Sequence, residues 1–171
     1  MDRETIDAAF AQLQKAPSIE IARQIYRRLE PAAVVSGHLL HGATYVAALV
    51  VDGLDSCTSG GRTLALELLF QIYNGYDLPG EMAKITQSRR CIVPVFDCVA
   101  HLALNSIVQE EVEAALDLLS TIAAHESAKH DEGIKVLELF LERRRGFTPL
   151  GVEQGVRIAL EDLTARPEQE A

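Results

Sequence analysis

Apolar residues recur at steps of three and four along most of the chain, which is the spacing of one face of an α-helix. The clearest stretch is 106–124, where aliphatic residues form one stripe and Glu110, Glu113 and Asp117 lie on another. No stretch alternates between apolar and polar residues for long enough to require a β-strand. The sequence therefore predicts an all-α chain with about eight helices.

Capping residues and prolines divide this pattern into separate helices. Asp2 and Ser18 are N-cap types and open the first two predicted helices, which end at Pro17 and Pro31. The looser stretch 31–42 has room for one short helix, and 57–61 is expected to be a turn. Further helices are predicted over 44–54, 62–73, 106–124, 134–145 and 148–164, and 81–104 is expected to hold a short polar helix followed by a longer one with Pro94 in its first turn.

Two short patterns repeat along the chain. Residues 65–69 and 72 match residues 115–119 and 122 at an offset of 50, with a weaker echo at 159–163. Residues 49–52 resemble 94–97 at an offset of 45. Two helices per unit with this period are typical of HEAT and armadillo solenoids, and the competing explanation is chance similarity among Leu-rich helices. We expect a short right-handed α-solenoid of stacked helical hairpins that forms a single domain over 1–171, with 166–171 a frayed tail.

One stretch resembles a known group of proteins. Residues 41–49, followed by the Leu-rich stretch 64–75, resemble the opening repeat of small bacterial HEAT-like proteins, and 92–96 provides a Pro-containing version of the motif. The chain departs from that pattern in having Leu40 before the His-Gly pair and no proline in its first repeat. Some members of the group are immunity proteins encoded beside secreted polymorphic toxins. The resemblance implies a protein that binds a cognate toxin.

Composition narrows the partner class. The 171 residues are 48% hydrophobic and 24% charged, which suits one folded domain, and the net charge is −9 with a pI near 5.0. This sign disfavours nucleic acids and anionic membranes and favours a basic protein partner. The three cysteines lack disulfide-framework spacing, and the longest apolar run, 43–51, is too short to span a membrane. We expect a cytoplasmic protein.

Metal binding is the main alternative function. Cys91, Cys98 and His101 follow one side of a predicted helix, and His38 and His41 have the spacing of a ligand pair. Seven residues of helix rise about 10 Å, however, so the first three cannot all reach one tetrahedral ion. Buried cysteines and packing histidines are the competing interpretation, and we expect neither a bound metal nor another cofactor.

Catalytic signatures are sparse. Asp97 could orient His101 as a base near Cys98, but the spacing of Asp97 and His101 is also that of an ordinary helix-surface pair. The stretch 59–62, Ser-Gly-Gly-Arg, could bind an anion before a helix, although neither a Walker lysine nor a preceding strand accompanies it. We therefore expect a protein that is not an enzyme.

Acidic residues are concentrated late in the chain. Residues 107–171 carry a net charge of −7, against −2 for residues 1–106. We expect an acidic ridge in which five residues contact a basic partner and steer its approach, although a merely solvated surface would show the same composition. These residues are Glu110, Glu113, Asp117, Asp131 and Glu138, and Glu111, Glu132 and Glu142 extend the expected ridge.

The function predicted from these features is a toxin-neutralising immunity protein that occludes the active site of its cognate toxin. A metal- or small-ligand-binding helical protein and a general scaffold subunit are the alternatives. The sequence leaves the oligomeric state and the activity of the partner open.

Overall fold

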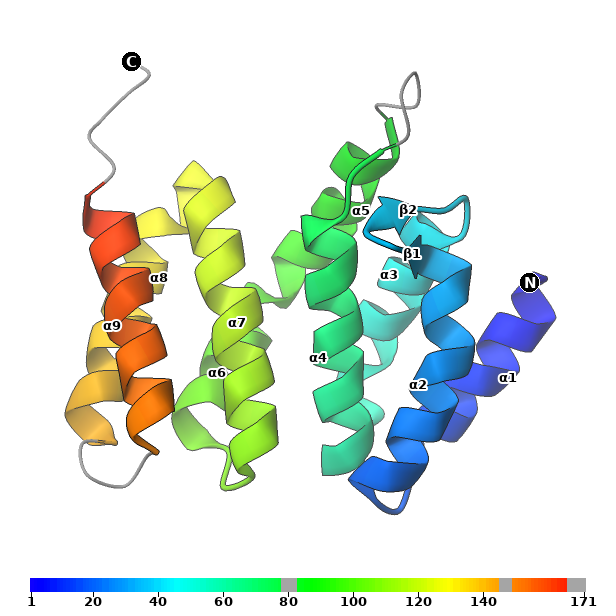
Figure 1. The fold of residues 1–171 in the computed structure, drawn as a ribbon, viewed down its shortest axis with the longest axis horizontal. Helices are drawn as coiled ribbons and strands as arrows, with labels where there is room; N and C mark the ends of the chain where they lie inside the picture. The colour runs from blue at the N-terminus through cyan, green and yellow to red at the C-terminus, as the bar shows by residue number, and fades with distance from the viewer. Residues whose placement is uncertain (78–82, 145–148, 166–171) are drawn as a thin grey trace. The chain divides into compact units, whose positions relative to one another are not determined.

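The computed structural model describes residues 1–77, 83–144 and 149–165. Within these residues the chain is helical apart from one very short β-hairpin, which confirms the all-α prediction (Figure 1). The α-helices are α1 (Arg3–Gln14), α2 (Ile19–Ala33), α3 (Ala43–Gly53), α4 (Ser59–Asn74), α5 (Ala83–Ile92), α6 (Phe96–Asn105), α7 (Gln109–His125), α8 (Ser127–Arg143) and α9 (Leu150–Thr164). Two 3₁₀ turns, η1 (Leu54–Ser56) and η2 (Val93–Val95), and strands β1 (Val34–Val35) and β2 (His38–Leu39) connect some of them.

Packing divides the chain into two compact units, Met1–Val95 and Phe96–Ala171, called here the N-terminal and C-terminal units. The organisation of 1–171 as one domain stays a prediction. Residues 166–171, for which a frayed tail was predicted, lie outside the described residues. Thr148, where the last helix was predicted to begin, also lies outside them, and α9 begins at Leu150.

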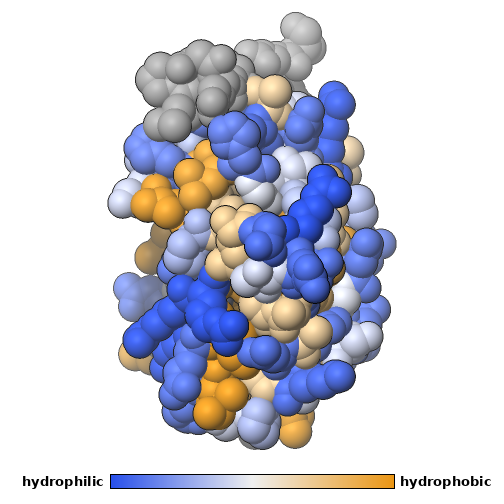
Figure 2. Space-filling view, turned by 90° about the vertical axis from the view of Figure 1, so that its right-hand side faces the viewer, coloured by the Kyte–Doolittle hydropathy of each residue, from blue (hydrophilic) through white to orange (hydrophobic). Residues whose placement is uncertain are grey.

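In the N-terminal unit, α2 and α4 lie side by side and α3 packs against both (Figure 1). The predicted N-caps are confirmed: the Thr5 N–H donates to Asp2 Oδ1 at 2.8 Å, and the Ile21 N–H donates to Ser18 Oγ at 3.5 Å. On the face that carries α1, the surface is mostly hydrophilic with separate apolar patches (Figure 2).

The predicted end of the second helix at Pro31 is wrong. Pro31 lies inside α2, one turn from its end, and the short helix allowed over 31–42 is replaced by the hairpin of β1 and β2. Ser36 and Gly37 both have positive φ, 52° and 81°, which is the backbone of a two-residue type I′ turn. The hairpin is joined to the end of α4 because the Leu39 N–H donates to the carbonyl of Tyr76 at 3.0 Å.

The helix predicted over 62–73 begins three residues earlier, within the stretch expected to be a turn. Thr58 caps α4, with the Gly61 N–H donating to Thr58 Oγ1 at 3.3 Å. A Cβ atom at Gly61 would lie 2.2 Å from the carbonyl oxygen of Leu13. Glycine is therefore required where the first turn of α4 meets α1.

The C-terminal unit is a four-helix packing, in which α7 contacts α6, α8 and α9. Pro94 lies in η2, directly before α6, and so interrupts no helix interior. The helix predicted over 134–145 begins at Ser127, and Gly133 lets α8 pass close to Ala123 of α7. Arg144, at the end of α8, donates to the carbonyls of Leu104 and Ser106 and so holds the α6–α7 connection.

The longer repeated pattern lies in one buried helix of each unit, whereas residues 49–52 lie in α3 and residues 94–97 span η2 and the start of α6. Ala65, Leu66, Leu68, Leu69 and Ile72 are buried in α4. Their counterparts in α7 are also buried: Ala115, Leu116, Leu118, Leu119 and Ile122. This pattern therefore marks α4 in the N-terminal unit and α7 in the C-terminal unit. No helix within the described ranges is long and apolar enough to cross a membrane.

Candidate partner-binding groove

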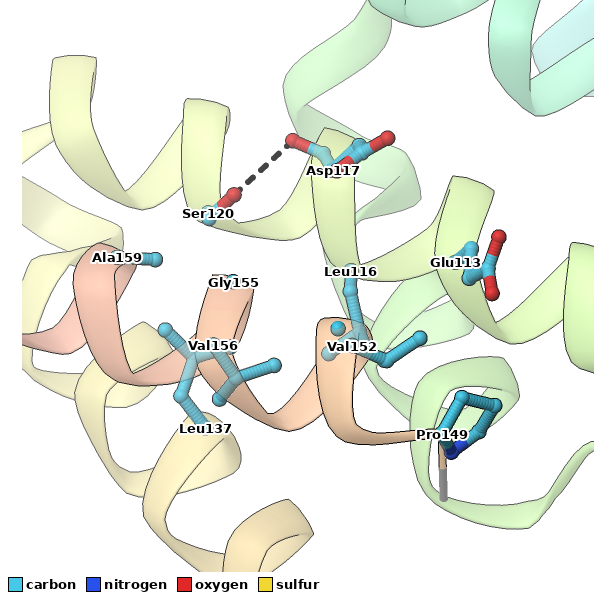
Figure 3. Close-up of a pocket in the computed structure, with 11 residues that line it drawn as sticks. Glu113, Leu116, Asp117, Ser120, Leu137, Pro149, Val152, Gly155, Val156 and Ala159 are labelled. Carbon is cyan, nitrogen blue, oxygen red and sulfur yellow. Dashed lines mark hydrogen bonds between the residues drawn. The ribbon is translucent and has the colours of Figure 1, made fainter.

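A groove with a volume of about 420 Å³ lies on the C-terminal unit between α7 and α9 (Figure 3). Leu116 of α7, Leu137 of α8, and Val152 and Val156 of α9 give it an apolar lining. Leu137 and Val156 are buried, so the floor of the groove is continuous with the core of the unit. The groove is formed entirely by helices of one unit, which makes it a preformed surface feature.

Two carboxylates, Glu113 and Asp117, stand on the α7 side of this groove (Figure 3). They are four residues apart, so they lie one helical turn from each other on the same face of α7. Gln109 Nε2 donates to Glu113 Oε1 at 2.7 Å. Among the described residues no cation forms an ion pair with either carboxylate.

Asp117 reaches solvent, yet the surrounding helices remove part of its hydration. This desolvation raises the pKa of the Asp117 carboxyl above its ordinary value, and the negative charge of Glu113 raises it further. An ionised Asp117 is therefore electrostatically unfavourable in the free protein. A cation placed in the groove would relieve that cost.

On the α9 side of the groove, small residues at every fourth position, Gly151, Gly155 and Ala159, lie beside Val152 and Val156. A Cβ atom at Gly151 or Gly155 would meet no heavy atom within 4 Å among the described parts of the chain. Neither glycine is therefore required by close packing within the unit. Their effect is to keep the groove wide and its α9 wall low.

Exposed apolar side chains continue the groove towards the start of α7. A smaller hollow of about 150 Å³ shares Glu113, Pro149 and Val152 with the groove and is also lined by Ile107. Ile107 is 97% exposed, and Leu150, next to Pro149, is 81% exposed. Large aliphatic side chains with so much exposed surface mark this end of the unit as a candidate contact area.

The structure separates the five residues predicted to bind a partner. Glu110, Glu113 and Asp117 share one face of α7, and the last two line the groove. Asp131 and Glu138 are both exposed on α8, seven residues apart on one side of that helix, and neither is among the residues that line the groove. The groove thus gathers two of the five.

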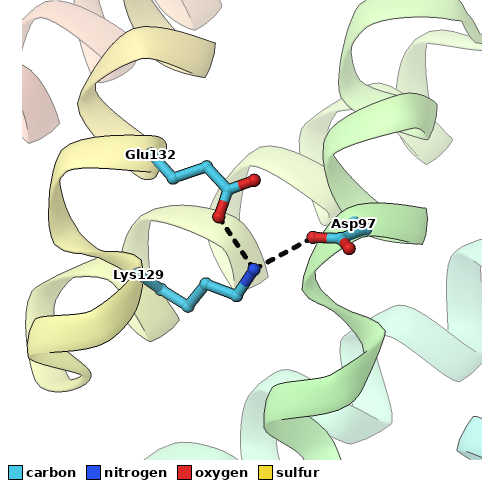
Figure 4. A network of polar contacts seen from close by, with 3 residues as sticks. All are labelled: Asp97, Lys129 and Glu132. Carbon is cyan, nitrogen blue, oxygen red and sulfur yellow. Dashed lines mark hydrogen bonds and ion pairs between the residues drawn. The ribbon is translucent and has the colours of Figure 1, made fainter.

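Two other members of the expected ridge have structural roles. Glu111 is only 3% exposed, and Ser106 Oγ donates a hydrogen bond to its Oε2, so the prediction that it lies on the acidic surface is wrong. Lys129 Nζ contacts Glu132 Oε2 at 2.8 Å and Asp97 Oδ1 at 3.0 Å, a pairing that ties α8 to α6 (Figure 4). The charge of Glu132 is therefore partly neutralised.

The candidate metal ligands of the alternative interpretation are spread over several elements. Cys91 lies in α5 and His101 in α6, with η2 between them, so the expectation that they follow a single helix is wrong. His101 Nδ1 lies 3.2 Å from Asn105 Nδ2. His38 packs its ring against Tyr76 at 4.3 Å between centroids, whereas His41 is exposed. Within the described residues, no group of three or more His, Cys, Asp or Glu side chains could hold a metal ion.

The Ser-Gly-Gly-Arg stretch is explained by packing. It forms the first turn of α4, where a Cβ at Gly60 would lie 3.0 Å from the backbone of Ser18 and Ile19. Arg62 donates to the backbone carbonyls of Leu54 and Cys57. This stretch therefore joins α4 to the preceding elements of the N-terminal unit.

Comparisons of the chain with protein-family models, with curated protein sequences and with solved structures gave no match.

Sequence reasoning found Glu113 and Asp117 but missed the opposite wall of the groove. The signal was present as small residues four apart at 151, 155 and 159, inside a stretch otherwise predicted to be a helix. Interpreting it required knowing that α9 packs beside α7 rather than elsewhere on the unit.

Proposed function

We propose that this chain is a protein-interaction module that binds a basic protein partner through the α7–α9 groove. The observation that carries the proposal is the pair of carboxylates, Glu113 and Asp117, on the rim of an apolar groove and without an ion-pairing cation among the described residues. A partner that brings a Lys or Arg to this rim neutralises the carboxylates, and its neighbouring apolar side chains cover the apolar lining of the groove.

In its most specific form, the proposal is a cytoplasmic immunity protein that occludes the active site of a cognate toxin. The resemblance of residues 41–49 and 64–75 to HEAT-like immunity proteins supports it, and so does the net charge of −9. Steric occlusion needs no chemistry in this chain. Toxins that act on nucleic acids or nucleotides have basic clefts, which an acidic inhibitor complements.

We further propose that the helical hairpins stack as a right-handed α-solenoid. Support comes from the repeat itself, because the matched positions are buried in α4 and in α7. Hairpins of this kind bury their apolar faces against their neighbours, and the stacked array then offers an extended binding face.

The five acidic residues are assigned two roles. Glu113 and Asp117 contact the partner directly, whereas Glu110, Asp131 and Glu138 act through the long-range field. Contacting charges affect both association and dissociation, whereas charges outside the contact mainly affect association and its salt dependence.

The test begins with affinity capture of a partner from the native lysate, followed by kinetics with the purified pair. The double variant Glu113→Lys, Asp117→Lys is expected to associate with the partner more slowly and to dissociate from it faster. Asp131→Lys with Glu138→Lys, which changes the net charge equally, is expected to slow association alone. Unchanged binding of the first variant at low salt contradicts the proposal, as does a captured partner that is acidic.

A further inference from the structure

We propose that the segment that docks in the α7–α9 groove is an amphipathic α-helix of the partner, with an apolar ridge against Gly155 and basic side chains one turn apart on Glu113 and Asp117. This inference rests on the proposed function for the existence of a protein partner, and it adds the shape and the side-chain pattern of the contacting segment.

The glycines of α9 provide the first argument. Glycine in a helix interior is less stable than alanine, so a glycine there is accounted for where close packing leaves no room for a Cβ atom. Gly133 meets that condition, because its Cβ would lie 2.3 Å from the Cβ of Ala123. Gly155 is also inside a helix, yet a Cβ there would enter open space. Packing within the described chain therefore leaves Gly155 unexplained, whereas a segment bound in the groove explains it.

The spacing of the groove walls provides the second argument. Gly151, Gly155 and Ala159 repeat every four residues along α9, and Glu113 and Asp117 repeat at the same interval along α7. Four residues of helix rise about 6 Å, so both walls present features at that interval. The side chains of a docked helix four residues apart repeat at the same interval and stay in register with both walls, whereas alternate side chains of an extended peptide lie about 6.8 Å apart and lose that register along the groove.

The chemistry of the two walls sets the pattern on the docked helix. Val152, Val156 and Leu116 would contact aliphatic anchors, and the low wall at Gly155 lets the helix backbone approach α9 closely. Glu113 and Asp117 would each pair with a Lys or Arg at the edge of those anchors. The exposed side chain of Ile107 extends the apolar contact beyond Glu113.

The test uses a phage-displayed library of linear peptides randomised at every position, selected on the full-length protein. We expect the enriched peptides to carry aliphatic anchors at three- or four-residue steps with Lys or Arg one turn apart. Gly155→Leu, which fills the groove, is expected to weaken binding of these peptides at least tenfold. Asp117→Asn with Glu113→Gln is expected to weaken it at least tenfold at low salt and less at high salt.

Two controls keep the result interpretable. Asp131→Asn with Glu138→Gln removes the same number of charges outside the groove and is expected to leave peptide binding within twofold. Circular dichroism checks that Gly155→Leu is folded, and Gly155→Ala, which adds one methyl group to open space, is expected to fold well and to weaken binding to a smaller extent.

Each contrary outcome overturns the inference. The first two are a selection that yields no groove-dependent binders and enriched peptides that lack basic residues. The others are enriched peptides with a two-residue, extended pattern and enriched peptides that bind Gly155→Leu as tightly as the wild type. The selection needs no natural partner, so its failure is separate from failure of the proposed function. A captured basic protein that binds Gly155→Leu less well than the wild type, but that contacts the groove with a loop or an extended segment in a structure of the complex, would preserve the proposed function and refute the docked helix.

Discussion

A Cβ atom placed on Gly133 of α8 would lie 2.3 Å from the Cβ of Ala123 on α7. Two Cβ atoms do not approach so closely, so the two helices can pack at this point only because residue 133 has no side chain. The contact lies in the interior, where Phe96 also approaches the same position at 3.9 Å. The separation of α7 and α8 therefore depends on this one residue.

Gly133→Ala is expected to lower the free energy of unfolding by about 1–3 kcal/mol, because overpacking outweighs the better helix propensity of alanine. Gly155→Ala makes the same chemical change in open space and is expected to raise it by about 0.5–1 kcal/mol. Urea unfolding of the two variants beside the wild type measures both effects. If the two substitutions shift stability in the same direction, the close contact at Gly133 does not control packing.

Ser106 and Glu111 form a second structural pair, at the start of α7. The Val108 N–H donates to Ser106 Oγ at 3.2 Å, and Ser106 in turn donates to the buried carboxylate of Glu111. Glu111→Ala is expected to cost about 1–3 kcal/mol, because it removes a buried acceptor. Glu110→Ala, at the neighbouring exposed position, is expected to change stability by less than about 0.5 kcal/mol. Equal thermal stability of the two variants would contradict the structural role of Glu111.

Helix content could be predicted from the sequence because apolar spacing reports the buried face directly. The errors arose where tertiary contacts override a local signal. Pro31 signals a helix end because it has no N–H to donate to residue 27, but α2 continues to Ala33, and both Ala32 and Ala33 are buried. Gly133 weakens the helical pattern of 127–133, but this stretch is the first part of α8, where the missing side chain lets α8 pack closely against Ala123.

The candidate site was only half predictable for a similar reason. The acidic face of α7 follows from helix periodicity alone, which identified Glu113 and Asp117. Periodicity also placed Glu111 near that face, and only the packed structure shows its carboxylate turned inward to Ser106. The α9 wall depends on which helix packs beside α7, and that is a property of the fold.

Cys57 is expected to be the least reactive of the three cysteines. Burial raises the pKa of its thiol from 9.0 to about 11, and its Sγ also contacts the carbonyl of Gly53 at 3.5 Å. At pH 8, this shift reduces the thiolate fraction by about a hundredfold. Cys91 and Cys98 are partly exposed.

Iodoacetamide labelling followed by peptide mass spectrometry should modify Cys57 last in the native protein. In urea the three cysteines should react at similar rates, and early native labelling of Cys57 would contradict its burial.

Asp117 makes the stability of the free protein depend on pH. Because desolvation and then Glu113 raise the pKa of Asp117 in the fold, the native state binds the Asp117 proton more tightly than the unfolded state does. Ionised Asp117 therefore lowers the free energy of unfolding at neutral pH, and that loss recovers as the pH falls through the raised pKa towards the ordinary value of 3.8.

Asp117→Asn, which resembles the protonated form, is accordingly expected to be more stable than the wild type at pH 7. Its advantage should shrink as the pH falls and should vanish below the ordinary pKa, where the wild-type carboxyl is protonated in both states. Urea unfolding from pH 7 down to pH 3 measures the difference at each pH. Asp131→Asn removes one charge from the exposed side of α8 and controls for the change in net charge. An advantage of Asp117→Asn that stays constant over this range would show that it comes from packing or helix propensity, and not from the carboxylate at the rim of the groove.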